Sequence, residues 1–117
     1  MKFHGNQKTN RRPHHLYLIY DYRRRQIYKF GISHDPVEQD GLSKRLRSQL
    51  KLHNSTEDVL RYRGRVLIID IEGREKAYWL EDESIDTFRL KHHGTFPNGN
   101  TDHNYKGRPS WFERDKD

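Results

Sequence analysis

The chain has 117 residues, 31% hydrophobic and 34% charged, with a formal net charge of +6 when histidine is neutral. This length suits one domain with a small core built largely from aromatic side chains, and the basic balance indicates a polyanionic partner or, more simply, favours solubility. With no cysteine, disulfides and thiolate metal sites are excluded, and no apolar run reaches membrane-spanning length.

The N-terminal segment is polar and basic and lacks the apolar core of a signal peptide. We expect residues 1–13 to form a flexible basic arm and residues 14–117 to form the folded domain.

Two apolar, aromatic-rich runs, Leu16–Asp21 and Gln26–Ser33, flank a basic turn. This pattern predicts a β-hairpin. Lys29 interrupts the second run shortly before Gly31, and a strand glycine often marks a close backbone approach. Lys29 either faces water or serves a site, and strict alternation places Tyr28 on the opposite face.

A helix is predicted next, ending at about His53. Ser43 can cap it, and Leu42, Leu46 and Leu50 repeat every four residues. Arg45 and Gln49 form the adjacent ridge. The other cations of this helix lie further round it: Lys44, Arg47 and Lys51.

A strand is predicted within residues 59–72. Its nearly continuous apolar run, residues 66–71, indicates a buried central strand. Arg61, Arg63 and Arg65 alternate ahead of that run and share one face, either solvated or in contact with phosphate.

The segment Arg74–His92 predicts a second helix. Glu81 lies on its core-facing side, along the stripe made by Ala77, Ile85 and Phe88. A carboxylate there is costly unless it pairs with an arginine, binds a metal or takes a proton. The neighbouring acids are expected to face solvent: Asp82, Glu83 and Asp86.

The C-terminal part, from His93, begins with a long loop of the kind that is usually functional or disordered. Ser110–Phe112 is predicted to anchor the chain end on the sheet. Together the elements predict an α/β (α+β) fold, a small central antiparallel sheet of three strands flanked by helices.

In this order the motifs resemble the GIY-YIG nuclease family. Leu16-Tyr17 stands where the family has Ile-Tyr, Lys29-Phe30-Gly31 where it has Tyr-Ile-Gly, and Arg45 and Glu81 match its helical arginine and glutamate. Pro97-Asn98-Gly99-Asn100 is similar to its late Pro-x-x-Asn. The chain departs from the family at His15, which replaces a glycine, at Lys29, which replaces a tyrosine, and in a longer loop before Arg45.

Further motifs of the chain, including Gly73-Arg74, resemble those of the C-terminal nuclease domains of polymorphic bacterial toxins. This implies an endonuclease that hydrolyses nucleic acid with Mg²⁺ or Mn²⁺, DNA being favoured over RNA. The resemblance also implies an immunity protein that inhibits the nuclease. It implies action in the cytoplasm, in this case that of a target cell after delivery. No membrane partner is expected.

The resemblance implies roles for five catalytic residues. Glu81 would be the metal ligand, Arg45 would grip a phosphate oxygen, and Tyr17 would orient or deprotonate the attacking water. Lys29 would stabilise the phosphate or lower the pKa of Tyr17, and Asn100 would brace the site. Contacts to nucleic acid are expected from a wider set: Arg23, Arg24, Lys44, Arg47, Gln49 and Lys51.

Three alternatives remain open. A non-catalytic nucleic-acid-binding module would use the same cations and aromatics, but it has no use for Glu81 on a packed face. A histidine-based metal enzyme lacks support, because the eight histidines show no helical i, i+4 metal motif. A protein-binding domain, with the aromatics as core, is the third.

Overall fold

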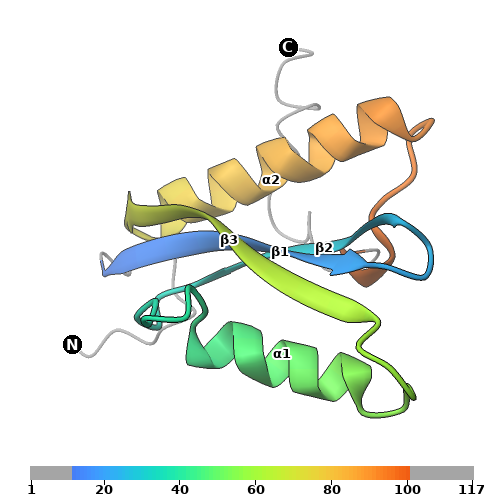
Figure 1. Cartoon of the computed structure of the whole chain (residues 1–117). Coiled ribbons are helices and arrows are strands. Elements are labelled where there is room, and N and C mark those ends of the chain that lie inside the picture. The colour runs from blue at the N-terminus through green and yellow to red at the C-terminus, as the bar shows by residue number, and fades with distance from the viewer. Residues whose placement is uncertain (1–11, 101–117) are drawn as a thin grey trace.

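The sheet has three antiparallel strands in the order β2-β1-β3, with one helix on each face (Figure 1). The computed structural model describes residues 12–100. β1 (Pro13–Asp21) is central, and β2 (Gln26–Ser33) and β3 (Tyr62–Glu72) are the edges. The predicted α+β architecture is confirmed. Of the arm predicted at residues 1–13, residues 1–11 lie outside the described residues, and Pro13 is the first residue of β1. The loop beyond Asn100 and the Ser110–Phe112 anchor also lie outside the described residues.

The β1–β2 hairpin is closed by Asp21. Its Oδ1 accepts hydrogen bonds from the backbone N–H groups of Arg23 (3.0 Å) and Arg24 (3.2 Å). Arg61, the residue before β3, donates to the same carboxylate, with Nε 2.9 Å from Oδ1 and Nη2 2.8 Å from Oδ2. This arginine also pairs with Glu57, so it has a structural role rather than a free, phosphate-facing one.

A β-bulge in β2 corrects the predicted placement of Tyr28. Ile19 pairs with Lys29 whereas Tyr20 pairs with Ile27, so Tyr28 is the extra residue. Its ring lies 4.9 Å from that of His53 on the first helix, and Lys29 also contacts this helix. The bulge therefore breaks the alternation, and both side chains lie on the same face of the sheet.

The prediction that residues 66–71 form a buried central strand was wrong. β3 is an edge strand, and Leu67, Ile68 and Ile69 each expose at least 40% of their surface. Its pairing with β1 slips twice, and Asp70 adopts a left-handed φ of 55°, which twists the strand at these irregularities. The apolar run specifies a strand, but it does not specify which elements cover it.

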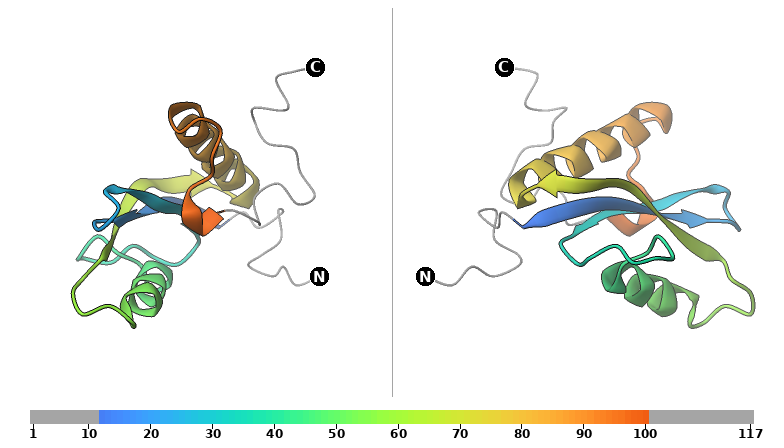
Figure 2. Two further views of the ribbon diagram at one scale, coloured as in Figure 1. Left: turned by 90° about the vertical axis from the view of Figure 1, so that its right-hand side faces the viewer. Right: turned by 60° about the vertical axis from the view of Figure 1, so that its left-hand side comes forward.

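The two predicted helices are confirmed. α1 (Lys44–Asn54) begins at Ser43, whose Oγ accepts the Leu46 N–H at 3.2 Å, and packs Leu46 against Tyr17 and Ile19. α2 (Arg74–Lys91) covers the opposite face, as both views of Figure 2 show. It packs Ala77, Ile85 and Phe88 there. A short 3-10 turn, η1 (Asn98–Asn100), follows.

The buried face of α2 is wider than predicted. Asp82 and Asp86 were expected in solvent, but they are 0% and 1% exposed. Asp86 lies 3.7 Å from the Arg89 guanidinium. The two acids lie one turn apart and flank the apolar stripe, so the surroundings of α2 cover that flank too. The prediction for them was wrong because the spacing locates a stripe but not its width.

Candidate active site

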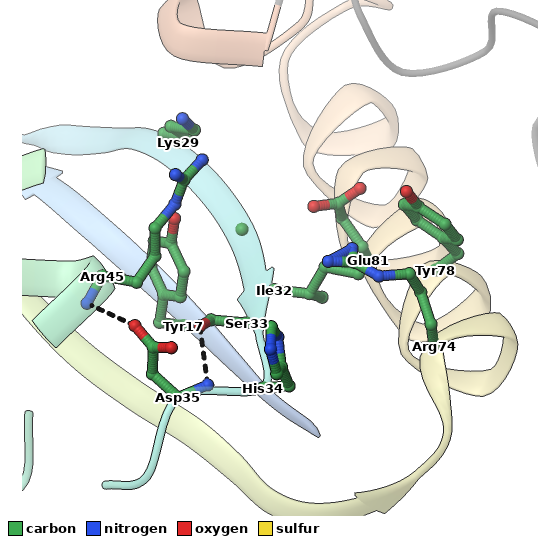
Figure 3. A pocket seen from close by; sticks show the side chains of 11 residues that line it. Tyr17, Lys29, Ile32, Ser33, His34, Asp35, Arg45, Arg74, Tyr78 and Glu81 are labelled. Atoms are coloured by element: carbon green, nitrogen blue, oxygen red, sulfur yellow. Dashed lines mark hydrogen bonds between the residues drawn. The ribbon is translucent and has the colours of Figure 1, made fainter. Parts of the chain in front are cut away.

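A pocket of about 470 Å³ lies on the β2 side of the sheet (Figure 3). Side chains from both faces reach it, because it is lined by residues of β1, β2, the loop after β2, α1 and α2. The lining residues are Tyr17, Lys29, Gly31, Ile32, Ser33, His34, Asp35, Arg45, Arg74, Tyr78 and Glu81. Four of the five predicted catalytic residues are therefore brought together, although the first and last of them, Tyr17 and Glu81, lie 64 positions apart in the sequence.

Tyr17 comes from the central strand and is 1% exposed. Its cross-strand partner is Gly31, and the missing side chain there leaves room for the ring. Burial raises the pKa of Tyr17, the charge and hydrogen bonding of Arg45 oppose this rise, and the charge of Glu81 adds to it. The phenol is therefore protonated at neutral pH.

Lys29 and Arg45 form the cationic side of the pocket. Lys29 Nζ donates to Gln49 Oε1 on α1 at 3.1 Å. Burial lowers the pKa of Lys29, Arg45 lowers it further, and Glu81 opposes the shift. The backbone N–H of Arg45 donates to Asp35 Oδ2 at 3.1 Å, which ties the first turn of α1 to the loop after β2.

Glu81 reaches the pocket from α2, on the other face of the sheet. It is 2% exposed, as its predicted core-facing position requires. Its charge raises the pKa of both Tyr17 and Lys29, so the carboxylate lies close enough to act on both. Figure 3 shows it across the pocket from the Tyr17 and Arg45 side chains.

Asn100 does not line the pocket but holds the backbone of β2 beside it through two hydrogen bonds. Its Oδ1 accepts the Phe30 N–H at 2.8 Å, and its Nδ2 donates to the Phe30 carbonyl at 2.9 Å. Phe30 lies between Lys29 and Gly31, so Asn100 fixes the backbone that presents both. Gly99 permits this approach, because a Cβ there would meet Tyr28 at 2.7 Å.

None of the six predicted nucleic-acid contacts lines the pocket. Arg23 and Arg24 are exposed in the hairpin turn, and Lys44 and Lys51 are exposed on α1. Arg47 is held by the carboxylates of Glu38 and Asp40. Gln49 is the acceptor for Lys29 described above. Arg23, Arg24, Lys44 and Lys51 are thus surface cations, of which Arg23 lies 3.7 Å from the Glu57 carboxylate, while Arg47 and Gln49 are held by intramolecular partners.

Several pocket residues were not predicted as site residues: Ser33, His34, Asp35, Arg74 and Tyr78. The sequence patterns assign no role to Asp35, and they give Arg74 only as the start of a helix and in the Gly73-Arg74 similarity. Ser33, His34 and Asp35 join Glu81 only through the packing of β2 against α2, which no spacing in the sequence specifies. Arg74 and Tyr78 lie seven and three residues before Glu81 on α2, so helical spacing is the signal that could have found them.

The donor set of the pocket suits a hard cation. Two carboxylates line it, Glu81 and Asp35, and no group of three or more potential metal ligands occurs within residues 12–100. Mg²⁺ takes one or two carboxylates and keeps several waters, whereas a zinc site needs three or four nitrogen, sulfur or oxygen ligands. Glu81, buried and facing the open volume, fits the first kind of ion.

Within the described part of the chain, no helix has both the length and the apolarity needed to cross a bilayer.

Comparison with curated proteins gives no match, and neither does comparison with solved structures. A family model, described as URI fold toxin 2, matches residues 7–93. That range includes both helices, the whole sheet and every residue of the pocket. The URI fold is nuclease-like, and the chain belongs to the URI fold toxin 2 family.

Proposed function

We propose that this domain is a metal-dependent endonuclease of the GIY-YIG type, the toxic part of a bacterial effector, and that it cuts DNA in preference to RNA. The observation that carries the proposal is the convergence of Tyr17, Lys29, Arg45 and the buried Glu81 in one pocket. Membership of a toxin family with a nuclease-like fold supports it.

The pocket offers the groups that phosphodiester hydrolysis needs. Arg45 binds a non-bridging oxygen through its planar fork, and Lys29 adds a second cation to stabilise negative charge that develops on the phosphate. Both are held by neighbours, Arg45 through its backbone contact with Asp35 and Lys29 through Gln49.

Glu81 would hold Mg²⁺ or Mn²⁺, which when bound supplies Lewis-acid neutralisation of phosphate charge. Tyr17, which its raised pKa keeps protonated at neutral pH, orients the attacking water by a hydrogen bond, and the proton of that water passes to solvent rather than to the phenol. Asn100 acts through Phe30 and keeps β2 in register with the pocket. It is a positioning residue.

The surface cations extend the binding area beyond the pocket. Arg23, Arg24, Lys44 and Lys51 are exposed on the turn and on α1, where they can neutralise further phosphates without reading sequence. The net charge of +6 also suits an acidic immunity protein that covers the same surface.

The test is incubation of the purified protein with plasmid DNA, single-stranded DNA and total tRNA, each with Mg²⁺ and with EDTA. We expect cleavage in Mg²⁺, faster on DNA, none in EDTA, and none by Glu81→Gln. Faster cleavage of tRNA would reverse the substrate preference alone. Cleavage in EDTA would contradict the metal dependence. Binding of all substrates without cutting would make the domain a binding module.

A further inference from the structure

Arg74 is a pocket cation for which the proposed chemistry has no use. It is the first residue of α2, is 8% exposed and lines the pocket. Its buried Nε has no hydrogen-bond partner among the described residues. A buried charged donor without an acceptor is costly, so a ligand that supplies acceptors is the simplest reason for this arrangement.

The surroundings of Arg74 orient it. Its guanidinium carbon lies 5.3 Å from the centre of the Tyr78 ring, which supports the planar group from one side. Figure 3 shows the Arg74 side chain extending from α2 toward β2, near Ile32 and His34. At the same helix end, Gly73 makes no side-chain cap bond, so the first N–H groups of α2 add positive potential beside the guanidinium.

Arg74 reaches the pocket from α2, across from Lys29 and Arg45 (Figure 3). It precedes Glu81 by seven residues on α2, roughly 10 Å along the helix axis. The pocket extends along β2 from Lys29 to the loop residue Asp35, and residues 29–33 alone span roughly 13 Å. That length exceeds what one phosphate group needs, so the Arg74 end is left for another part of the substrate.

We propose that Arg74, supported by Tyr78 and the N-terminus of α2, forms a second anion subsite that binds a phosphate of the substrate strand adjacent to the scissile one. This inference rests on the proposed function. Binding there holds the strand at two points, so that the scissile phosphate stays in register with Arg45 and Glu81. Arg74 is thus a substrate-binding residue that determines register.

The test uses oligonucleotides in which one phosphate is replaced by a neutral methylphosphonate. The cleaved bond is first mapped on an unmodified strand. The flanking phosphate on either side of that bond is then neutralised in turn. For the wild type, one of the two replacements should lower kcat/KM by about 10- to 100-fold, the loss expected for one charge-assisted hydrogen-bonded contact.

Arg74→Leu should show a similar loss on the unmodified strand and no further loss on that modified strand. Arg74→Lys, which keeps the charge but not the fork, should recover part of the rate. Lys91→Leu, an exposed site at the other end of α2, is the matched control and should behave as wild type. Equal sensitivity of Arg74→Leu and wild type to both replacements would overturn the inference and leave the proposed nuclease intact.

A binding measurement keeps the two proposals separable. In a Glu81→Gln background, adding Arg74→Leu should reduce the slope of log affinity against log salt for single-stranded DNA by about 0.7, the value for one lost phosphate contact. An unchanged slope, with circular dichroism showing a folded variant, would make Arg74 a packing residue. If the wild type cuts no substrate, the nuclease proposal fails while this slope still decides whether Arg74 binds phosphate.

Discussion

The ring of Tyr17 lies against Gly31 so closely that a Cβ at position 31 would be 2.3 Å from its Cζ and 2.4 Å from its hydroxyl oxygen. The two residues are partners across β1 and β2. The phenol thus passes over the edge strand at the one point where no side chain obstructs it. This contact explains how a central-strand residue reaches a pocket that Glu81 enters from the opposite face.

In Gly31→Ala, the added methyl group should therefore clash with Tyr17 more than with any other side chain. We expect a loss of about 1–3 kcal/mol in the free energy of unfolding, typical of overpacking, and loss of cleavage because the hydroxyl is displaced. Urea unfolding monitored by circular dichroism measures the first effect.

A double-mutant cycle with Tyr17→Ala is the control for this prediction, because removing the ring removes the clash. The cost of Gly31→Ala should then be much smaller in the Tyr17→Ala background than in the wild type. Equal costs in both backgrounds would show that the ring does not occupy the space above Gly31.

Asn100→Ala should destabilise the protein through Phe30. The substitution leaves a buried N–H and a buried carbonyl without the partners they have at 2.8 and 2.9 Å, at a cost of about 2–4 kcal/mol. Asn98→Ala, at an exposed position of the same turn, should change stability by less than about 0.5 kcal/mol. Similar unfolding midpoints for the two variants would argue against the bracing role.

Lys29, rather than Tyr28, should be the functional replacement for the second tyrosine of the family motif. Both side chains lie on the α1 face because of the bulge, but only Lys29 lines the pocket. Lys29→Met should slow single-turnover cleavage by about 10²-fold, whereas Tyr28→Phe should leave the rate within about twofold.

The pH profile tests the same residue. Since the pKa of Lys29 is lowered, its charge is lost at a lower pH than that of a free lysine. The cleavage rate should therefore fall as the pH rises through this pKa, which gives the profile an alkaline limb. Lys29→Met should lack the limb. A limb that persists in Lys29→Met would belong to another group.

Asp21 should determine part of the acid stability. Hydrogen bonding to Arg61 lowers its pKa in the folded protein, so its stabilising contribution is complete above the ordinary value of about 3.9 and is lost as the pH falls through the folded pKa. Asp21→Asn should lose about 2–4 kcal/mol at pH 7 and show a shallower dependence of stability below pH 4. Asp58→Asn, exposed nearby, is the control for stability. An acid limb in Asp21→Asn as steep as that of the wild type would contradict the assignment.

Much of this architecture could be predicted from the sequence. The Leu46 and Glu81 spacings locate both helices and the faces they bury, because a period of 3.6 residues fixes direction. The position of β3 at an edge, the bulge at Tyr28 and the burial of Asp82 could not be predicted. They depend on which elements pack together and on the pairing register of the strands, which the alternation of apolar and polar residues does not specify. Asp35 joins the site for the same reason, whereas Arg74 lies seven residues before Glu81 on one face of α2, a spacing that the sequence does contain.

The most direct test of the central claim compares Glu81→Gln with Glu83→Gln. Both substitutions remove one carboxylate from α2, but only Glu81 lines the pocket. Single-turnover cleavage in Mg²⁺ should fall by about 10³-fold or more for Glu81→Gln and by less than about twofold for Glu83→Gln, with both variants folded by circular dichroism. Equal rates for the two variants would contradict the assignment of this pocket as the catalytic centre.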